Sequence, residues 1–218
     1  NWADYGVEGF FKGTKPWMDY HDQLTGPLSK IVGALPHEVV VMNQLTVNLH
    51  LMLISFYKPR GKRFKILCEA KAFPSDQYMF ETHVRHHGFN PDEAIIEVKP
   101  RKGEECIHHD DIIKAIEQHG DELALVLFSG INYYTGQLFN IQSITTAAQK
   151  AGAKVGFDLA HAACNVSLQL HDWNTDFACW CSYKYLNSGP GAVGGVYIHE
   201  RYHKDKDITR FAGWWGYD

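Results

Sequence analysis

Short apolar runs with strand composition alternate with runs of helical spacing along almost the whole chain. The strand-like runs cover residues 39–42, 65–68, 94–98, 123–128, 154–158, 177–181 and 195–198, and the helical runs cover residues 45–54, 78–86, 110–119 and 141–151. The run at residues 123–128 is continuously apolar, as expected of a strand that is covered on both faces. The alternation predicts an α/β fold with a mostly parallel central sheet flanked by helices.

The overall composition is that of a globular protein. The chain has 218 residues, of which 45% are hydrophobic, so it can bury a substantial core as one domain or a large part of one. Its net charge of −4 offers no basic field for nucleic acid or for an anionic membrane. No apolar run approaches the roughly 20 residues of a membrane-spanning helix.

The five cysteines are Cys68, Cys106, Cys164, Cys179 and Cys181. They lack the spacing of a zinc site, which favours reduced thiols in a cytoplasmic protein. Those at 164, 179 and 181 lie among apolar residues and are expected to be inert core thiols.

Two further patterns are not expected to carry function. The histidines at positions 83, 86, 87, 108 and 109 form no closed ligand set, so no metal site is predicted. Residues 189–194 match the pattern G-x-G-x-x-G but precede a strand. A dinucleotide fingerprint follows a strand and opens a helix, so this match fails in its context.

Chemically useful side chains are expected at the carboxyl ends of strands, where open α/β sheets bind their ligands. They are Thr46 at the start of a helical run, Ser129, Asp158 with His161 three residues later, and Lys184. The helix start at Leu45 and Thr46 also offers free N–H groups that suit a phosphate.

Lys184 stands in the run CWCSYKYLN at residues 179–187, although burying an ammonium group without a partner is costly. A lysine, an acid at a neighbouring strand end, an aromatic ring and an anion-binding helix start are what pyridoxal 5′-phosphate requires. The lysine forms an imine, the acid keeps the pyridine nitrogen protonated, and the aromatic ring stacks on the cofactor.

Each of these residues also has an ordinary structural interpretation. Lys184 alone fits an ion pair, Asp158 a helix cap or turn, Phe73 core packing, and Thr46 a helix-start hydroxyl. Spacing alone leaves both interpretations open.

Several longer runs resemble kynureninase. They are GFDLAHA at 156–162, HDW at 171–173, FACWCSYKYLN at 177–187, LTVNLH at 45–50, EAKAFPSD at 69–76 and YTGQ at 134–137. The resemblance extends from about residue 9 to residue 216. It implies a homodimeric pyridoxal-phosphate enzyme of the aspartate-aminotransferase fold (fold type I). Residues 1–218 would then form an incomplete large domain, without an N-terminal segment and a C-terminal small domain.

The same motifs imply roles for individual residues. Lys184 would carry the cofactor and act in catalysis with Tyr183 and Asp76. The implied cofactor-binding set is Leu45, Thr46, Phe73, Pro74, Ser75, Asp76, Ser129, Asp158, His161, Tyr183, Lys184 and, across the dimer interface, Trp214. Asp158 would pair with the ring nitrogen, and Phe73 would stack on the ring.

The implied reaction is hydrolysis of L-kynurenine or 3-hydroxy-L-kynurenine to an anthranilate and L-alanine in tryptophan catabolism, the kynurenine pathway that feeds NAD biosynthesis. Phe10 follows Gly9 where animal members commonly have a histidine near the substrate ring. Phe10 is therefore the expected substrate-facing residue, and the preference between the two substrates stays open.

Two alternatives remain. One is another class-V enzyme, such as a cysteine desulfurase or an aminotransferase, although none of the five cysteines looks like a mobile catalytic thiol. The other is a catalytically silent fragment, because the family's substrate-binding arginine and an asparagine near the aryl ring would lie beyond Asp218.

Overall fold

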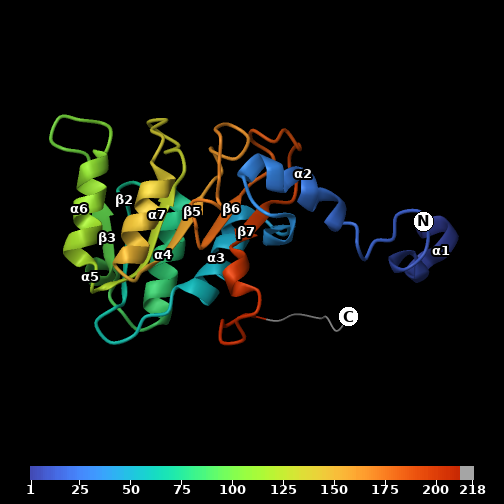
Figure 1. The fold of residues 1–218 in the computed structure, drawn as a ribbon, viewed down its shortest axis with the longest axis horizontal. Helices are drawn as coiled ribbons and strands as arrows, with labels where there is room; N and C mark the ends of the chain where they lie inside the picture. The colour runs from blue at the N-terminus through green and yellow to red at the C-terminus, as the bar shows by residue number, and fades with distance from the viewer. Residues whose placement is uncertain (212–218) are drawn as a thin grey trace.

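A computed structural model describes residues 1–211, in which one sheet is covered by helices on both faces (Figure 1). The strands are β1 (Val39–Val41), β2 (Lys65–Glu69), β3 (Ile95–Val98), β4 (Leu123–Ser129), β5 (Lys154–Asp158), β6 (Phe177–Trp180) and β7 (Gly195–Ile198). Each strand-like run of the sequence forms a strand, with boundaries that differ by one residue at most.

The sheet has the strand order β1-β7-β6-β5-β4-β2-β3. Strands β3, β2, β4, β5 and β6 run parallel, whereas β7 is antiparallel to both β6 and β1. The prediction of a mostly parallel sheet is therefore confirmed. Residues 189–194 lead into β7 and not into a helix, so the glycine pattern there lacks the setting of a dinucleotide site.

The α-helices are α1 (Trp2–Tyr5), α2 (Asp22–Val32), α3 (Leu45–Phe56), α4 (Pro74–His86), α5 (Pro91–Ala94), α6 (His109–His119) and α7 (Ile141–Lys150). Short 3₁₀ helices are η1 (Gly6–Phe10), η2 (Pro36–Glu38) and η3 (Glu200–Tyr202). Helix α4 begins earlier than its apolar spacing indicates, because proline suits the first helical position. Helix α2 was not predicted, because it contains Gly26 and Pro27, two residues that disfavour a helix interior.

The core consists of two apolar layers, one on each face of the sheet. Helices α3 and α4 contribute to one layer, and α2, α6 and α7 contribute to the other. Strand β4 serves both, since Leu125 and Leu127 face the first layer while Val126 and Phe128 face the second. Burying each such side chain stabilises the fold by about 1.5–3 kcal/mol.

The carboxyl ends of the parallel strands meet at one edge of the sheet. Glu69, Ser129 and Asp158 end β2, β4 and β5, and Ser129 pairs in register with Asp158. Helices α3 and α4 begin after β1 and β2 at this same edge, which is where an open parallel sheet binds its ligands. Among residues 1–211, no helix is long and apolar enough to cross a bilayer.

Candidate active site

A cavity of about 130 Å³ lies at this edge of the sheet. Its lining comes from the start of α3, the start of α4 and the segments that follow β4, β5 and β6. The lining residues are Gln44, Leu45, Thr46, Phe73, Ser75, Ser129, Ile131, Tyr133, Asp158, Ala160, His161, Tyr183 and Lys184.

Lys184 is half-buried in this cavity and contacts a ring nitrogen of His161. Its Nζ lies 2.9 Å from His161 Nε2 and 5.6 Å from the centre of the Phe73 ring. Burial, and then the charge of Lys184, lower the pKa of His161. A neutral His161 can therefore accept a hydrogen bond from the lysine, which gives the side chain a fixed position inside the cavity.

Asp158 and Asp76 form a buried pair of acids, of which Asp158 lines the cavity and Asp76 does not. They are 5% and 3% exposed, and their carboxyl groups are hydrogen-bonded to each other. Burial raises the pKa of both, and for Asp76 the neighbouring Asp158 raises it further. The N–H of Ala160 donates to Asp158 Oδ1 at 2.7 Å, so this carboxyl has a fixed orientation.

The first turn of α3 forms another part of the cavity lining. Its N–H groups at Leu45 and Thr46 have no acceptor within the helix, and they carry the positive end of the helix dipole. The side chain of Gln44 donates to the carbonyl of Ala192 at 3.0 Å, and Gly194 N–H donates to Asn43 at 2.7 Å. The loop that carries Lys184 is thereby attached to the start of α3.

Aromatic side chains form the remaining wall. Phe73 is 42% exposed, and its ring meets Tyr133 edge-on at 5.1 Å. Tyr183 is partly exposed beside Lys184, and burial followed by the nearby Cys181 raises its pKa. A flat ring that entered the cavity would meet the Phe73 face, while the Tyr183 hydroxyl stays protonated near neutral pH.

Most of the residues singled out in the sequence line this one cavity. They are Leu45, Thr46, Phe73, Ser75, Ser129, Asp158, His161, Tyr183 and Lys184. Asp76 lies behind Asp158, and Pro74 opens α4 without lining the cavity. Phe10 does not line it either and packs edge-on against Trp17. The N-terminal segment around α1 lies away from the sheet (Figure 1). Trp214 lies outside the described residues.

Four lining residues were not singled out from the sequence: Gln44, Ile131, Tyr133 and Ala160. A signal was available for three of them, because Gln44, Tyr133 and Ala160 adjoin or belong to the runs LTVNLH, YTGQ and GFDLAHA. No sequence signal marked Ile131, since it is an ordinary apolar residue in the loop after β4.

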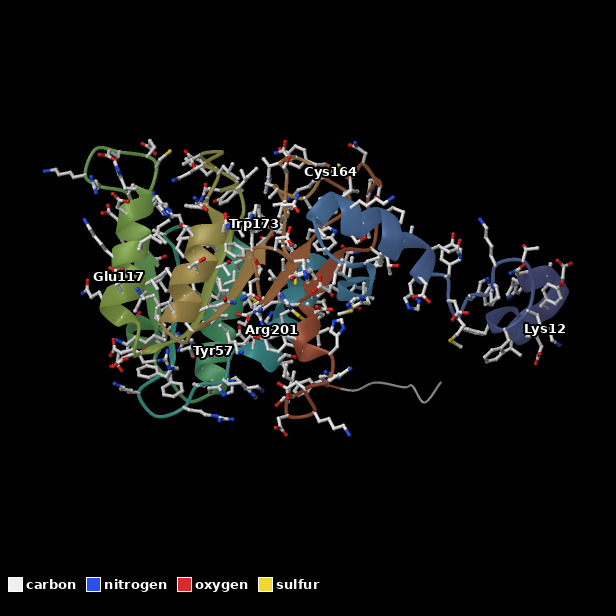
Figure 2. All side chains as sticks on the ribbon, in the orientation of Figure 1. Lys12, Tyr57, Glu117, Cys164, Trp173 and Arg201 are labelled. Carbon is white, nitrogen blue, oxygen red and sulfur yellow. The ribbon has the colours of Figure 1, made fainter. Side chains whose placement is uncertain are left out.

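All five cysteines are free, and one prediction about them was wrong. Cys179 and Cys181 are buried as expected, but Cys164 is exposed and lies on an outer loop (Figure 2). Its backbone has a φ of 66°, a left-handed conformation suited to tight turns. That turn directs the side chain outward although its sequence neighbours Ala162 and Ala163 are buried.

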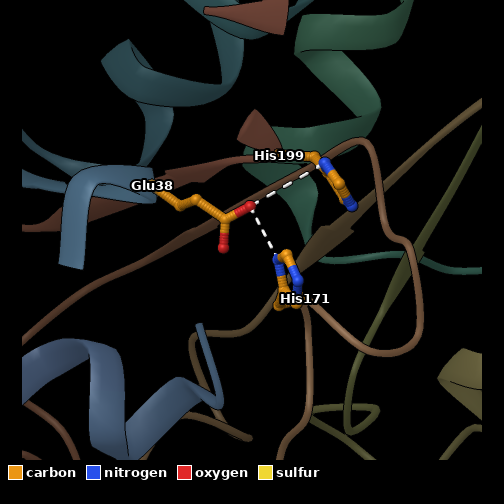
Figure 3. Close-up of side chains that lie close together, drawn as sticks. All are labelled: Glu38, His171 and His199. Carbon is orange, nitrogen blue, oxygen red and sulfur yellow. Dashed lines mark hydrogen bonds and ion pairs between the residues drawn. The ribbon is translucent and has the colours of Figure 1, made fainter. Parts of the chain in front are cut away.

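A second polar cluster, Glu38 with His171 and His199, lies apart from this cavity (Figure 3). The three side chains bring possible metal-ligand atoms within 4.8 Å of one another. Glu38 already accepts hydrogen bonds from Leu35 N–H at 2.9 Å, Glu200 N–H at 2.8 Å and His171 Nδ1 at 3.0 Å. The cluster therefore joins three parts of the chain through hydrogen bonds: η2, the segment after β5 and the end of β7.

Replacing Glu38 with glutamine is expected to remove a pH-dependent contribution to stability. The hydrogen bond to Glu38 raises the pKa of His171 above its usual 6.5. Burial alone would raise the pKa of Glu38, but bonds from Leu35, His171 and Glu200 lower it below 4.5. The contribution of His171 is complete below pH 6.5 and is lost as the pH rises through its raised value. That of Glu38 is present above pH 4.5 and is lost as the pH falls through its lowered value.

Urea denaturation across this range checks the prediction. The free energy of unfolding should fall by roughly 1–3 kcal/mol in Glu38→Gln, because buried donors lose a charged acceptor. The loss should be largest between the two shifted values. An equal loss at every pH would show that the ionic link does not contribute.

The profile of the Aminotransferase class-V family matches residues 74–213. These residues include Phe128, Asp158 and Lys184, and so they cover most of the sheet and most of the cavity. The chain therefore belongs to the class-V aminotransferase family.

The whole chain is also similar to curated proteins named kynureninase. It is 64% identical over 218 residues to the kynureninase of Flavobacterium johnsoniae, covering 100% of this chain and 51% of that protein. It is 62% identical to that of Flavobacterium psychrophilum, with the same coverage. The chain spans about half the length of the curated relatives it matches.

Among solved structures, the fold is similar to that of a cysteine desulfurase from Thermococcus onnurineus. The TM-score is 0.71 at 17% identity, over 92% of this chain and 50% of that one. An identity this low supports the shared fold alone. Together with the family match and the mostly parallel sheet, this similarity confirms the predicted fold class, the α/β fold of the aspartate-aminotransferase type.

Proposed function

We propose that the protein is a kynureninase, which hydrolyses the Cβ–Cγ bond of L-kynurenine or 3-hydroxy-L-kynurenine to an anthranilate and L-alanine. The observation that carries the proposal is the gathering of Lys184, Asp158 and Phe73 in one cavity. The 64% identity to a named kynureninase supports this reaction over others of the fold.

The cavity fits pyridoxal 5′-phosphate in the kinds of group that it presents. An amine, a buried acid, an aromatic face and a helix N-terminus all line it or lie directly behind it. When bound, the cofactor supplies an aldehyde that takes up an amine and a ring that withdraws electrons from the substrate. Thr46 and the first N–H groups of α3 would hold its phosphate, and Asp158 would face its ring nitrogen.

Lys184 would remove the proton from the substrate Cα, and His161 would hold the lysine amine in position. The lysine amine, once free, is the group in the cavity that can accept this proton as a general base. His161 Nε2, at 2.9 Å from Nζ, holds the amine in place and leaves its lone pair available after deprotonation. Phe73 beside it keeps water from one face of the site.

Tyr183 would deliver a proton at the end of the reaction. Its raised pKa keeps the hydroxyl protonated, so that it can donate to the carbon left by the departing aryl group. Its position next to Lys184 in the lining places a donor and an acceptor on the same loop.

The rival reaction, cysteine desulfuration, requires a thiol that reaches the bound substrate. Among the residues that the structure describes, no cysteine lines the cavity. Cys106 and Cys164 are exposed elsewhere. The composition of the site therefore argues against desulfuration.

We also propose that the enzyme works in the cytoplasm as a homodimer. The free state of all five cysteines supports a reducing compartment. Phe10 and Trp214 would act at the substrate and at the cofactor phosphate in that assembly, and a dimer would bring in segments that one chain does not supply.

The test is an assay of the full-length protein, loaded with pyridoxal phosphate, on L-kynurenine and on 3-hydroxy-L-kynurenine. Formation of an anthranilate and of alanine in equal amounts is expected for at least one substrate. Cofactor binding without either product, together with sulfur release from cysteine, would support the desulfurase instead.

A further inference from the structure

Glu69 is a buried acid that touches the site without lining it. It ends β2, and its side chain is only 2% exposed. Both carboxyl oxygens accept the N–H of Ser129 at 3.1 Å, and Oε1 also accepts the Ser129 hydroxyl at 2.5 Å. Ser129 itself lines the cavity. The chemistry proposed above gives Glu69 no role, although a buried carboxyl is costly to keep.

Glu69 completes a group of three buried acids. Asp158 ends the strand that pairs with β4, and Asp76 lies in the first turn of α4, which follows β2. Each of the three is 5% exposed or less. The charged or titratable groups around them lie on the cavity side and within the sheet: Lys184, His161, Tyr183 and Cys181 on the segments after β5 and β6, and the thiols of Cys68 and Cys179 in the strands.

Three carboxylates cannot all stay ionised in so small a buried space, because like charges repel strongly where water is excluded. The pKa of Glu69 is raised to about 7, because burial and the charge of Asp158 raise it by more than the bonds from Ser129 lower it. Glu69 in turn raises the pKa of Asp76. The protonation of each acid therefore depends on the others.

We propose that Glu69 is a positioning residue, which holds Ser129 in the cavity wall and by its charge controls how readily the Asp76–Asp158 pair releases its proton. When Glu69 is ionised, the pair keeps a proton; when Glu69 is neutral, the pair ionises more easily. The negative charge that faces the cavity thus depends on a group that the ligand never contacts. The consequence for catalysis rests on the proposed function, whereas the coupling among the acids does not.

Infrared spectroscopy of the full-length protein without cofactor tests the coupling directly, since protonated carboxyl groups have a resolved C=O band. Wild type should lose part of this band near neutral pH. In Glu69→Gln that part should be absent, and the remainder should titrate at lower pH, because a repelling charge has gone. The matched control is Glu97→Gln, which changes an exposed acid on the adjacent strand β3 and should leave the part of the titration near neutral pH unchanged.

Ser129→Ala provides a second variant that keeps every charge. It removes the hydroxyl bond that lowers the pKa of Glu69, so the titration near neutral pH should move to higher pH. Unchanged titrations in both Glu69→Gln and Ser129→Ala would overturn the inference. If one variant is too unstable to measure, an unchanged titration in the other variant overturns it alone.

The loaded enzyme gives an independent result. In Glu69→Gln, the limb of the kcat/KM profile that depends on the Asp pair should shift to lower pH, and Glu97→Gln should match wild type. A purely structural role would lower activity equally at all pH values. If no kynurenine is hydrolysed, the proposed function fails while the infrared result stands. If hydrolysis proceeds without the infrared shift, only this inference fails.

Discussion

Lys184→Ala is expected to reduce kynurenine hydrolysis by the full-length protein about 10⁴-fold or more. The substitution removes both the amine that would bind the cofactor covalently and the general base, and either loss alone costs orders of magnitude. The visible absorption band of the lysine-bound cofactor should disappear at the same time. Steady-state kinetics and an absorption spectrum of the dialysed protein provide the two measurements.

Lys114→Ala is the matched control for this experiment, because Lys114 is exposed on α6. It should retain wild-type activity and the wild-type spectrum. A Lys184→Ala protein that stayed within tenfold of wild type would rule out Lys184 as the amine that carries the reaction.

The second large effect is expected for Asp158→Asn. The amide keeps the shape of the side chain and can still accept the N–H of Ala160, which lies 2.7 Å from Oδ1. It cannot supply a negative charge opposite the ring nitrogen, and losing such preorganised electrostatic stabilisation costs about 10²–10³-fold in kcat. The fall should appear mainly in kcat, measured at saturating cofactor and substrate.

Asp110→Asn tests whether the effect is specific, because Asp110 is an exposed acid in the first turn of α6. Its kcat should equal that of wild type. The assigned role would be untenable if Asp158→Asn changed only the affinity for the cofactor and left kcat intact.

The fold was largely predictable because the apolar patterns of both its strands and its helices are clear in the sequence. The strands are short apolar runs and the helices between them have clear apolar spacing, so tertiary packing did not need to override local preference. The missed helix α2 shows the limit of this reasoning. Gly26 and Pro27 argue against a helix there, but α2 contributes Val32 and neighbouring apolar residues to the core of the sheet, and this packing outweighs the local cost.

The cavity was predictable where residues end strands or open helices, since topology alone brings such positions together. Thr46, Ser129, Asp158 and Lys184 all line it for this reason. Glu69 was missed because it reads as the polar end of a strand, and nothing in the sequence shows that both its oxygens point at Ser129. The role of Phe10 at the substrate stays a prediction, since a motif position indicates a role but gives no distance, and within this chain Phe10 packs against Trp17 and does not line the cavity.

The side chain of Gln44, directly before α3, donates to the carbonyls of Gly191 and Ala192, which are 147 and 148 positions further along the chain. These bonds lie beside β1 and β7, at the edge of the sheet. If strand β1 detached from β7, the first turn of α3, which is the proposed phosphate site, would separate from Lys184. The parallel strands β2 to β6 would remain folded. Such a protein would release its cofactor before the rest of the sheet unfolded. The rate of cofactor release would therefore measure the local stability of the edge strand β1.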